Sequence, residues 1–296
     1  MDFPFTGVIP IDKPPEATSR RVVNAVARAL QMRTVGHAGT LDPMATGVVV
    51  VCLGHATKLV DFIHQCSKRY EAVFLLGRSS PSDDLETPVE EEADPRRPSW
   101  EEILAALPAF RGEILQRPCD YSAVHIGGQR AYRLARKGCA IEMPARPVRI
   151  ESLAATSYEW PRLALTVECS TGTYIRAIGR DLATSLGTRS VMESLVRTSV
   201  GPFCLDASLP LADVSPDSVA ACLLPAGAAV THLPQVVLAG PAVDLAVRGA
   251  LFPASAISMI AAEHLAAIDE AGELMGILKL HTSGSYRLRP NFRGLG

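Results

Sequence analysis

The sequence has few of the features that mark membrane, secreted or metal-binding proteins. Among its 296 residues, no apolar run approaches the ~20 needed to cross a bilayer, and the N-terminus does not resemble a signal peptide. The seven cysteines are an odd number and form no C-x-x-C pair, which favours reduced thiols over a disulfide framework. Histidines and cysteines lack the spacing of metal ligands. These absences predict a cytoplasmic protein with no membrane association and no metal site.

An excess of positive charge is also missing. The net charge is −2, with 29 lysines and arginines against 31 acidic residues. That balance alone does not suggest a nucleic-acid-binding protein, but a phosphate backbone is bound by local basic surface. One stretch is rich in basic residues: Arg130, Arg133, Arg136, Lys137, Arg146 and Arg149. They form either an RNA-binding surface or a solvated helix face.

The most informative segment is a glycine-rich loop at residues 36–47, with one histidine and one carboxylate. The apolar run at 48–53 follows at once and predicts a buried strand. Asp42 is therefore expected on a loop held by a rigid strand, where catalytic groups are common, and glycines allow a ligand to approach closely. By itself, Asp42-Pro43 also fits an ordinary turn.

The first part of the chain predicts a helix before this loop and a strand after it. Thr18 or Ser19 can cap a helix that runs to about Leu30 with valines on one face. Residues 69–77 are expected to form a strand. Residues 78–98 are polar, acidic and rich in proline, and are interpreted as a loop or insertion.

A second strand and helix bring further polar residues together. Apolar residues alternate over 163–169, which predicts a half-buried strand, and helical spacing follows over 174–186. Residues 170–173 are then a strand-to-helix turn. Tyr174 and Arg176 are therefore expected at the start of a helix, close to the end of a strand.

The end of the chain has a different pattern. From Leu233 onward, short apolar pieces such as 245–247 and 274–280 alternate with glycines, which suggests a small β-rich module. We predict an α/β (α+β) protein with a mixed, mostly antiparallel sheet flanked by helices over 1–232. A small β-rich domain is predicted over 233–296.

Several motifs in a fixed order identify a resemblance. They lie at residues 7–19, 36–47, 53–59, 68–70, 121–123, 131–138, 169–176 and 195–197. In this order they resemble the TruB family of tRNA pseudouridine-55 synthases, over nearly the whole chain. The resemblance implies the pseudouridine synthase fold and a C-terminal PUA-like RNA-binding domain.

It also implies the chemistry. Such an enzyme isomerises uridine 55 to pseudouridine in the T arm of tRNA, after flipping the base out of its stack. By resemblance, Asp42 is the nucleophile, Tyr70 stacks on the flipped uracil, and Arg176 pairs with Asp42. An arginine beside a carboxylate fixes its orientation and favours its ionised form. Without the resemblance, a core tyrosine is the favoured interpretation of Tyr70, and a surface arginine that of Arg176.

Five further residues are assigned to substrate binding. By resemblance, His37 stacks in the RNA where the target base has left, and Tyr174 and Leu195 line the uracil pocket. Lys13 and Lys58 are candidates for phosphate contacts, although either also fits a plain surface lysine. The same resemblance implies no cofactor and a tRNA partner. The long basic tails of guide-dependent relatives are absent, so no guide RNA is expected, and a monomer is the default.

The chain departs from the family pattern at Glu16, Cys119, His125 and the turn at 79–84, which puts details of RNA docking in doubt. Two other functions remain open. A non-catalytic RNA-binding protein is disfavoured because Asp42, Tyr70 and Arg176 are all present. A glycoside hydrolase needs a second carboxylate as acid, and none stands out beside the loop.

Overall fold

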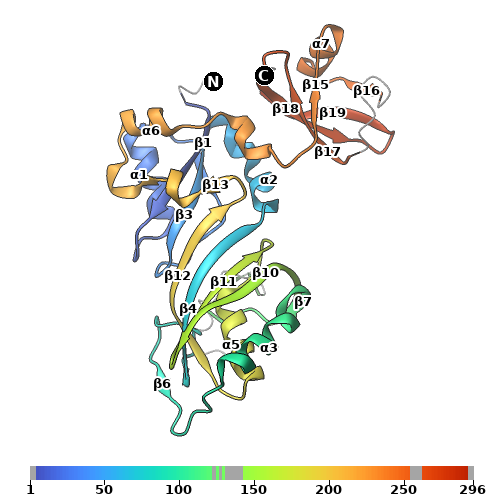
Figure 1. Ribbon diagram of the computed structural model, residues 1–296. Helices are drawn as coiled ribbons and strands as arrows, with labels where there is room; N and C mark the ends of the chain where they lie inside the picture. Colours follow the sequence, from blue (N-terminus) through green and yellow to red (C-terminus); the bar gives the residue numbers. More distant parts are fainter. Residues whose placement is uncertain (1–4, 122–124, 127–128, 131–142, 254–261, 293–296) are drawn as a thin grey trace.

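The computed structural model describes residues 5–121, 125–126, 129–130, 143–253 and 262–292. It contains a long ten-stranded sheet and, near the C-terminus, a separate five-stranded sheet (Figure 1). Part of the basic stretch interpreted as an RNA-binding surface or a solvated helix face, at 133–137, lies outside the described residues.

The large sheet comprises β1 (Gly7–Lys13), β2 (Val35–Ala38), β3 (Thr46–Leu53), β4 (Lys68–Leu76), β7 (Gly112–Gln116), β10 (Arg146–Glu159), β11 (Arg162–Cys169), β12 (Ser190–Val200), β13 (Phe203–Cys204) and β14 (Leu209–Pro210). The small sheet comprises β15 (Gln235–Val237), β16 (Leu251–Pro253), β17 (His264–Ile268), β18 (Leu274–Leu280) and β19 (Ser285–Asn291). Two short pairs are β5 (Arg78–Ser79) with β6 (Glu90–Glu91), and β8 (His125–Ile126) with β9 (Gln129–Arg130). The α-helices are α1 (Ser19–Ala29), α2 (Val60–Gln65), α3 (Trp100–Ala106), α5 (Ile175–Ser185), α6 (Pro216–Cys222) and α7 (Pro241–Val247). The 3₁₀ helices are η1 (Gly54–Leu59), η2 (Leu107–Phe110), η3 (Leu205–Ala207), η4 (Leu211–Asp213) and η5 (Ala226–Val230).

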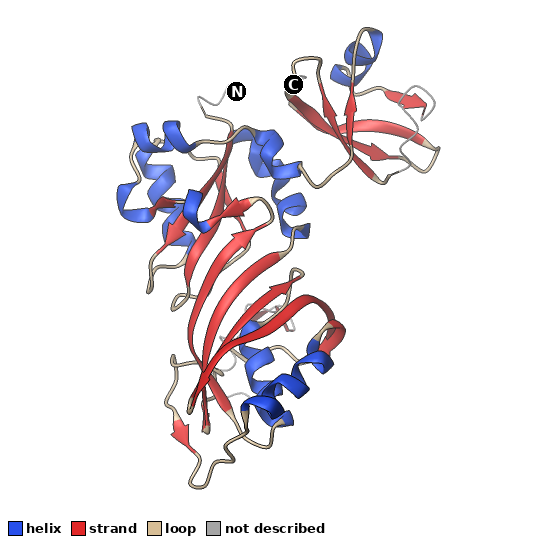
Figure 2. Cartoon of the chain, viewed as in Figure 1, coloured by secondary structure: helices blue, strands red, loops and turns tan. Residues whose placement is uncertain are grey.

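The order of the large sheet is β14-β1-β3-β12-β4-β11-β10-β7, with β2 beside β3 and β13 beside β12. Of these strand pairs, β1 with β14 and β3 with β12 are parallel, and the others are antiparallel. The prediction of a mixed, mostly antiparallel sheet is therefore confirmed. Apart from α7, which lies beside the small sheet, Figure 2 shows the helices in two groups, one around each end of the curved large sheet.

Strand β3 shows why the run at 48–53 is apolar without a break. Val49 and Val51 pack in the core cluster that contains residues of α1 and α5, whereas Val48 and Val50 pack in a second cluster with α2. Because successive side chains point to opposite faces and both faces are covered, no position in the run needs to be polar.

Helices α1 and α5 match the sequence predictions. The hydroxyl of Thr18 accepts a hydrogen bond from the amide of Arg21 (3.1 Å) and caps α1, whose valines are buried. In α5, Gly179 lies against the ring of Phe74 on β4, and an added Cβ would come within 2.0 Å of that ring. This close approach packs the middle of α5 against the C-terminal half of β4. None of the helices in the described part of the chain is long and apolar enough to cross a membrane.

The C-terminal sheet, in the order β15-β17-β18-β19-β16, fits the expected PUA-like domain. One detail of the β-module prediction is wrong: residues 245–247 lie in helix α7, where Pro241 at the first turn and apolar packing favour a helix. The sheet packs on the rest of the protein, since Ala266 and Ile277 join the cluster of α2 and the ring of His264 meets that of Phe62 edge-on at 5.3 Å.

The loop at 78–98 contains the pair β5–β6 but is otherwise irregular, as expected. Part of this loop nevertheless enters the interior, because Ser82 is fully buried and Asp84 is only 2% exposed. A buried carboxylate requires partners, and those of Asp84 lie in the candidate site described next.

Candidate active site

Asp42 lies in the loop between β2 and β3, which is held from both sides. The hydroxyl of Ser19 at the start of α1 accepts a hydrogen bond from the amide of Leu41 (2.9 Å). The amide of Ala45 donates to the carbonyl of Asp42 (3.1 Å), which closes a turn. Leu41 and Ala45 are buried, yet the side chain of Asp42 remains 36% exposed. The packed loop therefore presents one carboxylate at a fixed position.

The carboxylate lines a cavity of about 200 Å³ together with Tyr70, Tyr174 and Arg176. An adjoining cavity of about 100 Å³ shares these four residues and adds Leu195. Five of the eight predicted site residues, from four separate segments of the chain, therefore surround one narrow space. Its size suits a flat, ring-sized group rather than a large ligand.

Arg176 holds two carboxylates at once. Its Nη2 lies 3.1 Å from Oδ2 of Asp42, and its Nη1 lies 3.0 Å from Oδ2 of Asp84. Nη1 also donates to the carbonyl of Ser82 (2.9 Å), and Nη2 to that of Tyr121 (3.1 Å). Burial alone acts to lower the pKa of Arg176, but the surrounding acidic groups outweigh it and raise the pKa. The guanidinium is thus a fixed cation, held by Asp84 on one side, that orients the carboxylate of Asp42 on the other.

Asp84 was missed by sequence reasoning. Its Oδ1 accepts from the hydroxyl of Ser82 (2.5 Å) and the amide of Glu86 (2.9 Å), so both of its oxygens are engaged. The expectation that no acidic residue stands beside the loop is therefore wrong. Asp84 faces Arg176 and does not line the cavity, so it is poorly placed to protonate a leaving group there.

Two opposed influences act on the carboxyl of Asp42. Burial is the stronger and raises its pKa, because desolvation disfavours the charged form. The charge and hydrogen bond of Arg176 oppose that rise, while Asp84 adds to it. The surroundings of Asp42 therefore disfavour its charged form, and Arg176 favours it, a setting that suits a nucleophile.

Arg197 is a second residue that sequence reasoning left without a role. It is 2% exposed, and its Nε donates to the carbonyl of Val48 (2.7 Å), with longer bonds to the carbonyls of Thr40 (3.3 Å) and Gly39 (3.2 Å). It also lies opposite Tyr70 in the β4–β12 pairing. Burial raises the pKa of Tyr70, and Arg197 opposes this, so the phenol keeps its proton near neutral pH. Arg197 thus ties the loop of Asp42 to the strand of Tyr70.

The cap residue of α5 is fixed as well. Gln116 forms two hydrogen bonds with the backbone of Tyr174, accepting from its amide (2.8 Å) and donating to its carbonyl (3.0 Å). The guanidinium of Arg146 lies over the tyrosine ring, 4.9 Å from its centroid. One residue of the basic stretch, Arg146, therefore serves to position a wall of the cavity.

The prediction that Lys13 contacts phosphate is wrong. Its side chain is fully buried, and its ammonium donates to the carbonyls of Pro14 (3.0 Å), Ala17 (2.8 Å) and Pro43 (3.1 Å). Burial lowers its pKa to about 8, and the charge of Asp42 acts against that shift. All three donors of the lysine are used within the protein, so its role is to tie β1 to the loop of Asp42.

His37 and Lys58 lie outside the cavity. His37 is half-buried on β2 and pairs with Val51, and burial lowers the pKa of its imidazole. Lys58 is exposed in η1 and lines a separate cleft together with residues of the C-terminal sheet. Neither position conflicts with a contact to a large ligand that extends beyond the cavity.

The departures from the family pattern have distinct settings. Glu16, where the family usually has glycine, adopts a positive φ of 63°, a conformation that glycine tolerates best. Cys119 is buried, and burial, together with Asp83, raises its pKa well above the usual value. The backbone of His125 lies in the β8–β9 pair. Among the described residues, no group of three or more acidic, histidine or cysteine side chains could hold a metal ion.

Solved structures share this architecture. A Cbf5–Nop10–Gar1 complex contains a chain with 26% identity and a TM-score of 0.74, covering 93% of this chain and 78% of that one. An H/ACA ribonucleoprotein bound to a substrate RNA containing 2′-deoxyuridine has a chain with 24% identity and a TM-score of 0.75, covering 97% and 85%. These similarities establish the fold.

Sequence comparisons are more specific. Residues 27–175 match the family described as TruB family pseudouridylate synthase, N terminal domain. The protein named tRNA pseudouridine synthase B from Rhodopirellula baltica is 40% identical, over 78% of this chain and 70% of that protein. A protein of the same name from Gloeobacter violaceus is 42% identical, over 79% and 82%. The chain therefore belongs to the TruB family of pseudouridylate synthases.

Proposed function

We propose that this enzyme isomerises uridine 55 to pseudouridine in the T arm of tRNA. The N1–C1′ bond breaks, the uracil turns, and a C5–C1′ bond forms; C5 loses a proton and N1 gains one, so no atom enters or leaves overall. The proposal rests on family membership and on relatives named tRNA pseudouridine synthase B. The isomerisation needs neither a redox cofactor nor a metal.

One observation carries the assignment of roles: a carboxylate and a tyrosine line the same ring-sized cavity, and a buried arginine holds the carboxylate. In this proposal Asp42 is the nucleophile, and Arg176 maintains its charge and direction. Tyr70 stacks on the uracil, with Tyr174 and Leu195 as further walls. The base must be flipped out to reach this cavity, and His37 would fill the space that it leaves.

We also propose that residues 233–296 act as an RNA-binding domain joined to the catalytic domain at 1–232. A cleft of about 640 Å³ supports this role, lined by the basic side chains of Lys58, Arg248, Lys279, Arg287 and Arg289. The cleft receives cations from both η1 and the C-terminal sheet. A phosphate backbone lying in it would bind both parts of the protein.

The test is incubation of the purified protein alone with an unmodified tRNA transcript, followed by mapping of pseudouridine at single-nucleotide resolution. We expect one modified position, uridine 55, without any guide RNA and as a monomer in solution. A transcript with cytidine at position 55 is the matched control. Tight binding without product in the uridine transcript would favour a non-catalytic RNA-binding protein instead.

A further inference from the structure

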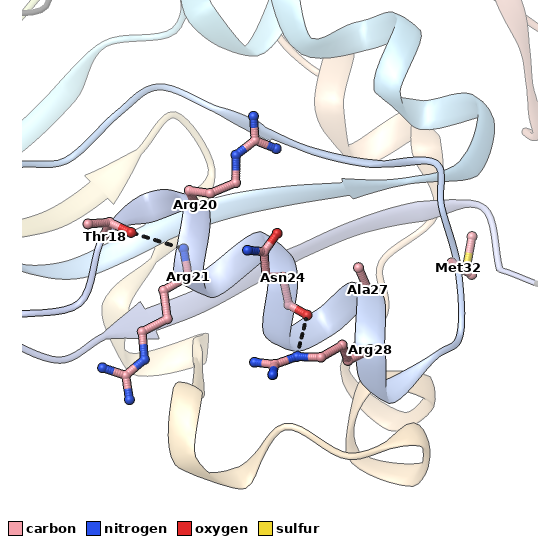
Figure 3. Close-up of a pocket in the computed structure, with 7 residues that line it drawn as sticks. All are labelled: Thr18, Arg20, Arg21, Asn24, Ala27, Arg28 and Met32. Atoms are coloured by element: carbon pink, nitrogen blue, oxygen red, sulfur yellow. Dashed lines mark hydrogen bonds between the residues drawn. The ribbon is translucent and has the colours of Figure 1, made fainter.

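Helix α1 presents an exposed face whose charged side chains are all basic. Val22, Val23 and Val26 point into the core, while Arg20, Arg21, Asn24 and Arg28 are exposed and line an open groove of about 460 Å³. Figure 3 shows Arg21 and Arg28 along the same side of the helix, with Arg20 directed away from them. The 11-residue helix carries no acidic residue, although the chain as a whole is slightly acidic.

Among the described residues, these arginines have no ionic partner, unlike many others on the surface. Within the described residues, no carboxylate forms an ion pair with Arg20, Arg21 or Arg28, and Arg28 donates only to a backbone carbonyl of its own helix. Many other arginines are paired with acidic side chains: Arg69, Arg78, Arg96, Arg117, Arg162, Arg180 and Arg189. Three guanidinium groups around one groove, without a carboxylate partner in the described part of the chain, form a surface suited to an anion.

The N-terminal end of this face is joined to the loop of Asp42. Ser19, the first residue of α1, is buried and hydrogen-bonds to the backbone of Leu41, next to Asp42. Arg20 is also close enough to His37 that its charge adds to the lowering of the pKa of that imidazole, for which burial is the main cause. One end of the groove, lined by Thr18 and Arg20, therefore lies at the end of α1 that holds the loop of Asp42.

We propose that the α1 face binds the phosphodiester backbone of the RNA strand next to the flipped uridine. This inference rests on the proposed function and adds to it a defined contact surface. Residues 21 and 28 are seven positions apart, so they lie ~10 Å apart along the helix axis, about three nucleotides of a stacked strand. Guanidinium groups at this spacing can contact separate phosphates without reading sequence.

The test compares two double variants that each remove two positive charges. Arg21→Gln/Arg28→Gln changes the α1 face and leaves Arg20, the neighbour of His37, in place. Arg162→Gln/Arg189→Gln is the matched control, because both arginines are exposed and ion-paired elsewhere. Arg162 is paired in register with Leu75, five residues along β4 from Tyr70, or ~17 Å.

Dissociation constants are measured over a range of salt concentrations for two RNAs: the full tRNA transcript and its isolated T-arm hairpin. Both carry cytidine 55, so that no turnover occurs. For the α1 variant we expect at least about tenfold weaker binding to both RNAs at physiological salt. We also expect a salt dependence reduced by about 1.8 in log–log slope, for two lost duplex phosphate contacts. The control should match the wild type.

Three results would overturn the proposal: equal losses in the two double variants, weaker binding with an unchanged salt slope, or a loss seen with tRNA but not with the hairpin. Arg21→Lys/Arg28→Lys guards against misfolding, since it keeps the charges and should retain the slope. The proposed function is tested separately by product formation on the uridine transcript. Its failure would leave these binding comparisons valid.

Discussion

Two sets of charges in this protein have opposite settings. Around Asp42, the side chains of Arg176 and Asp84 are buried, and Arg176 lies between Asp42 and Asp84 at defined distances from both. On α1, the arginines are exposed and have no carboxylate partner among the described residues. The cleft near Lys58 resembles α1, because basic side chains line it.

The difference indicates a division of work. A buried ion pair loses several kcal/mol when one partner is removed, because the other charge is left unpaired, whereas an exposed charge loses little within the protein itself. The buried set is therefore suited to fix geometry for a reaction. The exposed set is suited to attract and hold a polyanion. Substitutions in the buried set should therefore change the reaction rate, and substitutions in the exposed set should change RNA affinity.

The largest effect is expected for Asp42→Asn. The amide keeps the size and most of the shape of the carboxylate but is not an ionised nucleophile. We expect pseudouridine formation under single-turnover conditions to fall below detection, while RNA affinity changes little. Product formed at a rate comparable to the wild type would show that Asp42 is not the nucleophile.

The second-largest effect is expected for Arg176→Ala. Removing one partner of a buried pair costs ~3–5 kcal/mol, and if most of this appears in the transition state, the single-turnover rate falls by about 100- to 5,000-fold. Circular dichroism should confirm that the variant is folded. A folded variant with nearly wild-type turnover would mean that Arg176 does not support the chemistry.

Asp84→Asn should have a smaller effect through Arg176. It weakens one charge-assisted hydrogen bond, worth about 1.5–3 kcal/mol, so we expect a rate lower by roughly tenfold to a hundredfold. The neighbouring Asp83→Asn is a close control, since Asp83 pairs with Arg180 instead. Equal rates for the two variants would argue against a specific role for Asp84.

The pH dependence of the reaction rate should depend on the pair Asp42–Arg176. The reaction needs ionised Asp42, so the rate should fall as pH falls through the pKa of that carboxyl, which burial raises. Arg176 stabilises the ionised form, so Arg176→Gln should move this acidic limb to higher pH. Single-turnover rates between about pH 5 and 8 measure the limb. If the acidic limb of the rate profile does not move in this variant, Arg176 does not influence the ionisation of Asp42.

The smallest effect is expected for Lys58→Gln. Loss of one exposed cation should weaken RNA binding a few-fold and reduce the salt slope by about 0.9, without a change in fold. Arg162→Gln removes one charge elsewhere and serves as the control. Salt-independent weakening would mean that Lys58 does not contact phosphate.

The sequence allowed good prediction of the elements with a strong local signal. The unbroken apolar run of β3, the cap at Thr18 and the turn before α5 all depend on neighbouring residues, and each is found where it was expected. Helix α7 was missed because its short apolar piece fits a strand equally well. Short apolar runs have no periodicity that separates the two.

Contacts between distant segments could not be predicted in the same way. Asp84 and Arg176 are 92 positions apart, and an acidic, proline-rich loop has no local feature that marks one carboxylate as buried. Lys13 was misjudged for a related reason. Three backbone carbonyls surround its ammonium, and backbone acceptors leave no trace in side-chain patterns. The functional roles of the site residues stay predictions.

The division between buried and exposed charges is tested most directly by one measurement: the single-turnover rate as a function of enzyme concentration, for Arg176→Ala and Lys58→Gln beside the wild type. The plateau reports the chemistry, and the half-saturating concentration reports binding. We predict a much lower plateau for Arg176→Ala. For Lys58→Gln, a shifted half-saturation at salt near 0.15 M is expected instead. A normal plateau for Arg176→Ala with a shifted half-saturation would contradict this account.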